Sequence, residues 1–319
     1  MVKALVPLNR QEDLADYQKA GAGEYYIGFW DSKWHKKFGE YADINRLTGY
    51  KKATNYNTFQ EILPIIQRVK AEQAAIYVTF NSSIYSQDQL DYMEKYMQPL
   101  LEAGVDGIIV SCPELVEIAR RNNINAIIST IAGVYNSDIV KYYKQLGVKR
   151  VILPRDLSVD DIEKIVITVP DMEYEVFMMR NGCVFSDSNC LGLHRSEKSA
   201  ICATLNNSES KLINESTESH ICDETELNHF LYHKVFHSNA CGLCSIFRFV
   251  KMGICAGKIV GRSDESEYVC EDIRLICHNI KIAEKCTSEK EYLENMEFPS
   301  NSTKRCEYGM NCYYPETRF

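Results

Sequence analysis

The sequence predicts an α/β fold, a TIM-like (β/α)₈ barrel, and three features of the 319-residue chain support it. Short apolar runs alternate with amphipathic segments through the first 180 residues. Gly104 and Gly147 each follow an amphipathic segment, where helices commonly end in a left-handed residue. An eighth apolar run, Gly257–Val260, comes after a long interruption at residues 183–256. Strands that alternate with helices through right-handed crossovers form a parallel sheet, and eight such units close a TIM barrel.

The apolar runs are strand-like in length and composition. The predicted strands are Lys3–Pro7, Glu24–Gly28, Ala75–Phe80, Gly107–Ser111, Asn125–Ser129, Arg150–Pro154, Glu173–Met179 and Gly257–Val260. The segments between several of them have helical periodicity, and polar residues such as Thr58 (or Asn57) and Ser158 can cap them. The predicted helices are Gln11–Ala20, Phe59–Glu72, Gln87–Ala103, Pro113–Arg121, Ser137–Leu146 and Ser158–Ile165.

A doubly wound open sheet is the alternative fold for the same alternation of strands and helices. It would be supported by a glycine-rich phosphate-binding fingerprint between a strand and a helix. Gly21 and Gly23 lack the third glycine of that fingerprint and follow a helical segment. The barrel is therefore the favoured prediction.

The predicted organisation is a barrel over residues 1–262 and a helical, cysteine-containing extension over residues 263–319. The barrel includes a cysteine-rich insertion at residues 183–256, between the seventh and eighth strands. Part of this insertion, residues 200–237, is rich in Ser, Asn and Glu, which is typical of an exposed excursion.

Charge and hydropathy limit the possible partners. The net charge of −8 argues against broad nonspecific binding of nucleic acid, although a single structured RNA stays possible. The first residues contain no apolar stretch that resembles a signal peptide, and no run of about 20 apolar residues indicates a membrane helix. We therefore expect a cytoplasmic protein with no membrane partner, in which cysteines stay reduced.

The cysteines are the strongest chemical signal, because twelve of the 13 lie after Gly182. Cys183 and Cys190 directly follow the predicted seventh strand, where active sites of barrels lie. Cys202 follows, and Cys241-x2-Cys244 opens a helical stretch. Four thiolates from separate loops suit an iron–sulfur cluster or a structural zinc ion, and the alternative is a set of scattered core cysteines.

Four polar residues lie at or near predicted carboxyl ends of strands: Asn81, Thr130, Arg155 and Lys258. Arg155 and Lys258 are suited to bind a carboxylate or phosphate, and Arg262, just beyond the last strand, could do the same. The alternative for each is an ion pair at the rim of the barrel.

Residues 29–57 are long for a loop between a strand and a helix, and they contain Trp30 and Trp34 among several lysines. One interpretation is a lid that stacks on a planar, negatively charged substrate. The other is a surface excursion that its aromatic residues anchor.

Two late patterns have plainer interpretations. His229, His233 and His237 share the spacing of one helical face, but Phe230 stands where a zinc protease has glutamate, so a polar helix face is favoured over a second metal site. Cys306-x5-Cys312 fits spare thiols, a second metal site or a closing staple.

Four segments follow one another along the chain: ALVPLNRQEDLADYQKAGAGEYYIG, GVDGIIVSCPEL, ISTIAGVYNSDIVKYYKQLGVKRVILPRDLS and EYEVFMMRNGCVFSDSNC. In this order they resemble the U32 family of collagenase-like peptidases, whose first strand–helix–strand unit is similar to the first segment. GICAGKIVGR resembles the family's eighth strand and the following turn. The resemblance implies a barrel holding a 4Fe–4S cluster on four cysteines.

Carried over by position, the resemblance assigns Cys183, Cys190, Cys202 and Cys241 as ligands, with Cys244 as the runner-up for the fourth. The chain departs from the family at Met179-Arg180, which replaces a His-Gly pair, at Arg155-Asp156-Leu157, and around the third cysteine. These departures place it in a divergent branch.

Members of the family resemble either proteases or oxygen-independent hydroxylases, some of which use prephenate. We predict the second class: an iron–sulfur redox enzyme that acts on RNA, a peptide or a small aromatic substrate, with an electron donor or a homologous partner. Asn81, Arg155 and Lys258 are the predicted catalytic residues. The predicted substrate-binding residues are Trp30, Trp34, Thr130, Arg180 and Arg262. A collagenase-like peptidase and a noncatalytic zinc-stabilised binding protein are the alternatives.

Overall fold

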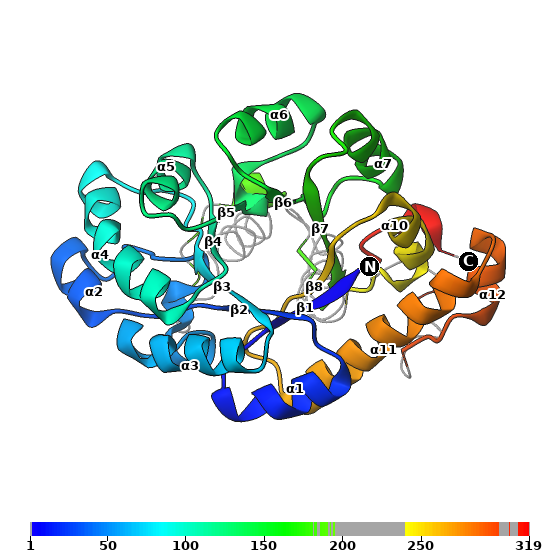
Figure 1. Cartoon of the computed structure of the whole chain (residues 1–319), viewed down its shortest axis with the longest axis horizontal. Coiled ribbons are helices and arrows are strands. Elements are labelled where there is room, and N and C mark those ends of the chain that lie inside the picture. The colour runs from blue at the N-terminus through cyan, green and yellow to red at the C-terminus, as the bar shows by residue number, and fades with distance from the viewer. Residues whose placement is uncertain are drawn as a thin grey trace, which may run out of the picture.

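The computed structural model describes residues 2–180, 182–183, 186–190, 192, 194, 240–299, 306 and 312–318, with the backbone alone at residues 51–53. Eight parallel strands form a closed barrel surrounded by helices, which confirms the predicted TIM-like fold (Figure 1). The strands are β1 (Lys3–Pro7), β2 (Glu24–Ile27), β3 (Ala75–Phe80), β4 (Gly107–Val110), β5 (Ala126–Ile128), β6 (Arg150–Ile152), β7 (Glu173–Met179) and β8 (Ala256–Ile259).

Each strand pairs in parallel with the next one in the sequence, and β8 closes the ring by pairing with both β7 and β1. Leu5 of β1 lies opposite Glu24 of β2 on one side and Lys258 of β8 on the other. This closed ring rules out the open sheet. The register between β7 and β8 shifts between Phe177 and Met179, close to the carboxyl end of the barrel.

The helices of the ring are α1 (Leu14–Ala20), α2 (Ser32–Phe38), α3 (Phe59–Ala71), α4 (Gln87–Ala103), α5 (Pro113–Arg121), α6 (Ser137–Gln145), α7 (Val159–Thr168), α10 (Ile246–Met252), α11 (Ser266–Lys285) and α12 (Glu289–Asn295). The expected caps form, since the hydroxyls of Thr58 and Ser158 accept backbone N–H groups of the first turns of α3 and α7. Gly104 ends α4 with φ of +85°, the left-handed conformation that glycine adopts without strain.

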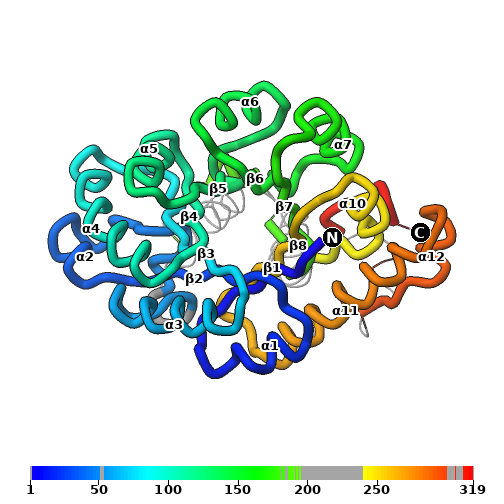
Figure 2. The backbone as a smooth tube through the Cα atoms, in the orientation of Figure 1, coloured from blue at the N-terminus to red at the C-terminus, as the bar shows by residue number. Residues whose placement is uncertain are grey.

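Four of these helices are additional to the six predicted by their ranges: α10 lies in the helical stretch expected after Cys244, α11 and α12 lie in the expected helical extension, and α2 was not expected. Helix α2 lies inside the 29–57 excursion and begins after Asp31, whose carboxylate accepts the N–H of Lys33 at 2.8 Å. Helix α11 is 20 residues long and packs beside α1, β1 and α10, as the tube trace shows (Figure 2). Among the described residues, no helix has the length and apolar character needed to cross a membrane.

Charged side chains fill part of the barrel interior. At the amino ends of the strands, Arg150 of β6 reaches across to Glu24 of β2 with both terminal nitrogens, one of them at 3.2 Å. Arg150 also donates from Nε to Glu173 at 2.7 Å. Further along the strands, Lys258 pairs with the fully buried Glu175 at 2.8 Å. Buried charges are tolerated because each has an opposite charge within hydrogen-bonding distance.

The pair of Arg150 and Glu24 makes the first testable prediction. Replacing Arg150 with Met leaves the buried Glu24 carboxylate without this partner, so the free energy of unfolding should fall by about 3–5 kcal/mol. Urea denaturation measures the change. Lys141→Met is the control, because Lys141 pairs with Asp138 on the exposed surface of α6 and its loss should change stability by less than about 1 kcal/mol. Equal stability of Arg150→Met and the wild type would contradict the assignment.

Candidate active site at the carboxyl end of the barrel

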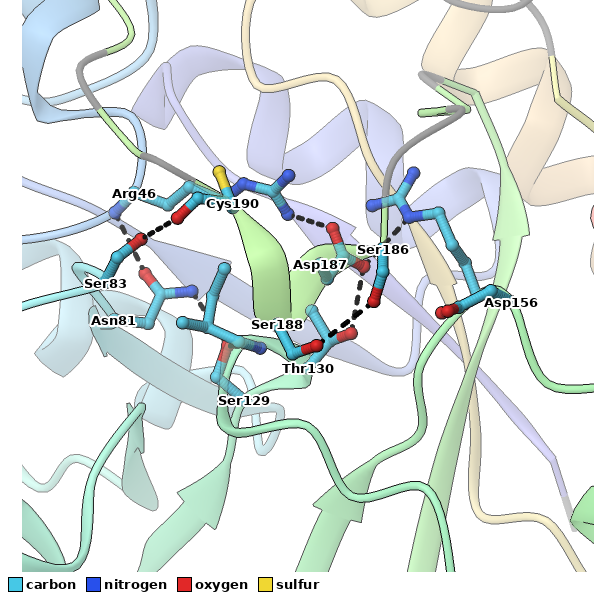
Figure 3. A network of polar contacts seen from close by, with 12 residues as sticks. Arg46, Asn81, Ser83, Ser129, Thr130, Asp156, Ser186, Asp187, Ser188 and Cys190 are labelled. Atoms are coloured by element: carbon cyan, nitrogen blue, oxygen red, sulfur yellow. Dashed lines mark hydrogen bonds and ion pairs between the residues drawn. The ribbon is translucent and has the colours of Figure 1, made fainter. Parts of the chain in front are cut away.

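The centre of the site is the buried carboxylate of Asp187, in the short 3-10 turn Asp187–Asn189 after β7. One oxygen accepts from Nε of Arg155 at 2.9 Å and from Oγ1 of Thr130 at 2.9 Å, and the other forms an ion pair with Arg46 (Figure 3). These residues follow β2, β5, β6 and β7. Asp187 therefore joins four loops at the end of the barrel where TIM-barrel active sites lie.

Electrostatics keep Asp187 ionised. Burial alone would raise the pKa of Asp187, but the guanidinium groups of Arg155 and Arg46 and their hydrogen bonds outweigh it and hold that pKa well below its usual range. Arg155 also lies over the ring of Phe177, with Cζ 4.3 Å from the centroid. A packed ring and a charged hydrogen bond together fix the position of Arg155.

A second set of contacts fixes the segment that carries Cys190. Asn81 donates to the hydroxyl of Ser129 at 3.1 Å and accepts from the backbone N–H of Arg46 at 3.3 Å. Ser83 donates to the carbonyl of Cys190 at 2.9 Å. In Figure 3 these residues lie beside the Asp187 group, so the loops after β3 and β7 are held together.

Three of the cations predicted to face the mouth have different environments. Arg155 and Lys258 are both buried and paired, with Asp187 and with Glu175 respectively. For these two the ion-pair alternative describes what the structure shows, and Lys258 lies within the barrel rather than at its rim. Arg262 is also buried, but it donates to the side-chain oxygens of two asparagines instead of a carboxylate.

The aromatic excursion has one anchoring and one partly exposed tryptophan. Trp34 of α2 is fully buried, donates from Nε1 to the carbonyl of Ala42 at 2.7 Å and packs against Phe38 and Tyr92. A ring without exposed surface does not stack on a substrate, so the anchoring interpretation holds for Trp34 in this structure. Trp30 is partly exposed and stacks on His35, with centroids 4.9 Å apart.

Arg180, the residue before the cysteine segment, is tied to α11. Its φ of +66° is left-handed, which is uncommon for a residue other than glycine. The side chain forms an ion pair with Asp272 and donates to the carbonyl of Tyr268 at 3.0 Å. Its predicted contact with substrate stays a prediction.

The thiols of Cys183 and Cys190 lie near the same arginine. Burial would lower the pKa of Arg46, but Asp187 first, and then Cys190 and Cys183, raise it. Both cysteines are partly buried. Soft thiols near a partly buried cation suit an iron–sulfur cluster, because the cation offsets the negative charge of thiolate ligands.

The structure says less about the other two predicted ligands, Cys202 and Cys241. Cys202 lies outside the described residues, as do the three histidines of the insertion. Cys241 forms an antiparallel bridge with Met179 and a parallel bridge with Cys312, and its Sγ accepts the N–H of Leu243 at 3.5 Å. Within the ranges the structure describes, no three Cys, His, Asp or Glu side chains are gathered so as to hold a metal ion. The donor chemistry fits a cluster, while the complete ligand set stays a prediction.

Several residues of the site were missed from the sequence. Asp187 stands between two cysteines that we singled out, and an acidic residue in that loop was the available signal. Arg46 belongs to an excursion in which only the aromatic and lysine residues attracted notice. The placement of Cys312 beside Cys241 had no signal in the sequence, because the two are 71 positions apart.

The fold and the site together define a TIM-barrel protein whose mouth has a buried arginine–aspartate cluster flanked by cysteines. The sequence profile of peptidase family U32 matches residues 18–316, so this chain belongs to that family. The family predicted from the motifs is thereby confirmed.

Relatives with names are similar over parts of the chain. A tRNA hydroxylation protein P from Haemophilus influenzae is 37% identical over 117 residues, which are 36% of this chain and 25% of the relative. The tRNA hydroxylation protein P1 of Bacillus subtilis is 32% identical over 136 residues, 42% of this chain and 32% of the relative. An uncharacterized protease of Methanocaldococcus jannaschii is 27% identical over 154 residues, 47% of this chain and 37% of that protein. These matches therefore span between 25% and 37% of the relatives' lengths.

Solved structures resemble this chain with lower sequence identity than these relatives do. A U32 peptidase structure has a TM-score of 0.44 and 15% identity, over 57% of this chain and 70% of that chain.

The Asp187 group makes a prediction that depends on pH. Asp187→Asn removes a buried charge that two arginines need, so at pH 7 the variant should be about 3 kcal/mol less stable than the wild type. Because the pKa of Asp187 is lowered by folding, its stabilisation is present above the ordinary carboxyl pKa of about 4 and is lost as the pH falls below it. Urea denaturation at pH values from 7 to 3 should therefore show that the difference in free energy of unfolding between the wild type and Asp187→Asn becomes smaller as the pH falls.

The control is Asp138→Asn, which changes an exposed carboxylate at the start of α6. It should differ from the wild type by less than about 1 kcal/mol at pH 7. A difference between wild type and Asp187→Asn that is equally large at pH 7 and pH 3 would contradict the proposed ion cluster.

Proposed function

We propose that this chain is an iron–sulfur enzyme of the U32 family that takes part in oxygen-independent hydroxylation of tRNA. The observation that carries the proposal is the position of Cys183 and Cys190, which flank Asp187 in the sequence and lie near the partly buried Arg46 at the mouth of the barrel. The names of relatives in Haemophilus influenzae and Bacillus subtilis support tRNA as the substrate.

The proposed ligands are Cys183, Cys190 and Cys202, with Cys241 as the fourth and Cys244 as its alternative. A bound 4Fe–4S cluster would supply single electrons, which hydrolysis of a peptide bond does not need. The residues of the chain have supporting roles. Arg46 places positive charge beside the thiols of Cys183 and Cys190.

Asp187 holds the loop between these two cysteines. It hydrogen-bonds Thr130 and Arg155, which follow other strands, so the loop is fixed to the barrel at its centre. Ser83 fixes the same loop at Cys190 through the carbonyl group. Cys183 and Cys190 would hold a cofactor from a segment that is tied, through Asp187 and Cys190, to residues that follow β3, β5 and β6.

Metal analysis tests the ligand assignment. Protein purified without oxygen should contain iron and labile sulfide and absorb visible light, and Cys183→Ser or Cys190→Ser should lose most of the iron because each removes one of four ligands. The matched control is Cys277→Ser, whose thiol on α11 donates to the carbonyl of Gly21 at 3.3 Å, outside the barrel. This control should keep the iron of the wild type.

Cys312→Ser tests the fourth ligand separately, because Cys312 pairs with Cys241 through the backbone. Retained iron in Cys312→Ser together with lost iron in Cys241→Ser supports Cys241 as the fourth ligand. Normal iron content in both Cys183→Ser and Cys190→Ser, or colourless wild-type protein that contains zinc, would overturn the iron–sulfur assignment.

The substrate needs its own experiment. The chain should restore hydroxylated nucleosides, detected by mass spectrometry of bulk tRNA, in a bacterial host that lacks its own tRNA hydroxylation proteins. Cys190→Ser should not restore them, whereas Cys277→Ser should. Restoration by Cys190→Ser to the wild-type level would contradict a role of the cysteine loop in the reaction.

A further inference from the structure

Arg262 carries a buried positive charge that no carboxylate of the described residues neutralises. The residue follows β8 and is 6% exposed. Its guanidinium donates from Nη1 to Oδ1 of Asn55 at 3.2 Å and from Nη2 to Oδ1 of Asn45 at 3.0 Å. A guanidinium has five N–H donors, so three have no protein partner in the part of the chain that the structure describes. A buried cation in this state is unusual, because buried charges are generally paired.

The charged residues around Arg262 do not neutralise its positive charge. Burial, partly opposed by Tyr26 and aided by the positive charge of Arg46, lowers the pKa of Arg262 to about 10, so the group is still protonated at neutral pH. Two buried carboxylates of this region already pair with other cations, Glu175 with Lys258 and Asp187 with Arg46. Arg262 thus lies among charges that are balanced without it.

The asparagines that accept from Arg262 do not need it for their own hydrogen bonding. Oδ1 of Asn45 also accepts the backbone N–H of Leu47 at 3.1 Å. Oδ1 of Asn55 also accepts from Nδ2 of Asn45 at 3.1 Å. Removing the guanidinium would therefore leave neither oxygen without a donor, and the two amides act as a support that orients Arg262.

The backbone leaves space for the guanidinium at one glycine. Gly28 directly follows β2, and a Cβ atom built on it would lie 2.0 Å from Nη1 of Arg262 and 2.6 Å from Oδ1 of Asn55. No side chain fits at this position while Arg262 lies there. The carboxyl end of β2, the asparagines of the following loop and the residue after β8 together hold the guanidinium over the mouth of the barrel.

We propose that Arg262 is the receptor for a small oxyanion, a carboxylate or a phosphate, at the carboxyl end of the barrel. A carboxylate or phosphate oxygen would take the donors that the protein leaves unused, and the planar guanidinium offers two of them side by side. The bound anion would supply the negative charge that this site lacks. The inference concerns the same end of the barrel as the proposed function, but it requires no iron–sulfur cluster.

Binding is tested on the full chain with two probes, sodium malonate and inorganic phosphate. Isothermal titration calorimetry and the melting temperature are measured at constant ionic strength, balanced with sodium chloride. The wild type should bind at least one probe saturably and melt at a higher temperature in its presence. Saturation by malonate alone assigns a carboxylate, and saturation by phosphate alone assigns a phosphate; either result supports the proposal.

Two variants test the residue. Arg262→Gln removes the charge and should weaken binding of the probe by at least about tenfold, because hydrogen bonds to charged groups are lost. Gly28→Ala keeps the charge but displaces the guanidinium, so it should weaken binding as well. Lys164→Gln is the control, because Lys164 is an exposed cation on α7, and it should bind as the wild type does.

The melting temperature without anion separates binding from folding. Arg262→Gln should melt no lower than the wild type, because no acceptor loses its last donor and no carboxylate loses a partner. If this variant does not fold, Gly28→Ala and the wild type still decide the question. Absence of saturable binding to the wild type, or equal affinity in wild type and a folded Arg262→Gln or Gly28→Ala, overturns the proposal. Iron content is measured on the same samples, so failure of the anion site and failure of the cluster assignment are told apart.

Discussion

The ion cluster around Asp187 is the constraint on which the carboxyl end of the barrel depends. A (β/α)₈ barrel fixes its strands by backbone hydrogen bonds, but its loops need further contacts to acquire one arrangement. One fully buried carboxylate here takes charge-assisted bonds from Arg46 and Arg155 and a hydroxyl bond from Thr130. Because these partners follow different strands, the position of the cysteine loop is determined by the barrel as a whole.

The interior shows how charge is distributed along the strands. Arg150 and Glu24 pair at the amino ends of the strands, and Lys258 and Glu175 pair further along. In each of these two pairs, a positive side chain and a negative side chain neutralise each other. At the carboxyl end, Asp187 balances part of the positive charge, and Arg262 keeps its own. Within the described residues, the guanidinium without a carboxylate partner thus lies at the end where ligands of such barrels bind.

The sequence predicted the barrel well because apolar periodicity is local. Strand β3 and helices α4 and α5 have the predicted limits; Ser86 and Gly104 mark the ends of α4, and Pro113 marks the start of α5. The excursion at residues 29–57 was recognised, yet helix α2 was not, because its seven residues give too short a pattern.

The site was harder to predict because its contacts join distant residues. Arg46 and Asp187 are 141 positions apart, and no local pattern connects them. Lys258 was expected at the mouth of the barrel. Its position in a four-residue strand does not reveal which side chain it meets inside the barrel, and in the structure it pairs with Glu175 of the neighbouring strand. The cysteine loop was found since thiols are rare and informative, whereas the arginines around it resemble ordinary surface residues in a sequence.

The closure of the ring by β8 has a consequence for the order of events during synthesis. Strand β8 pairs with both β1 and β7, and it is synthesised after every cysteine from Cys183 to Cys244. Until then β1 and β7 have unpaired edges, which are prone to associate with other chains. The unfinished chain therefore contains the cysteines of the insertion before its sheet can close, and a cell that makes it has reason to protect the open sheet until the last strand arrives.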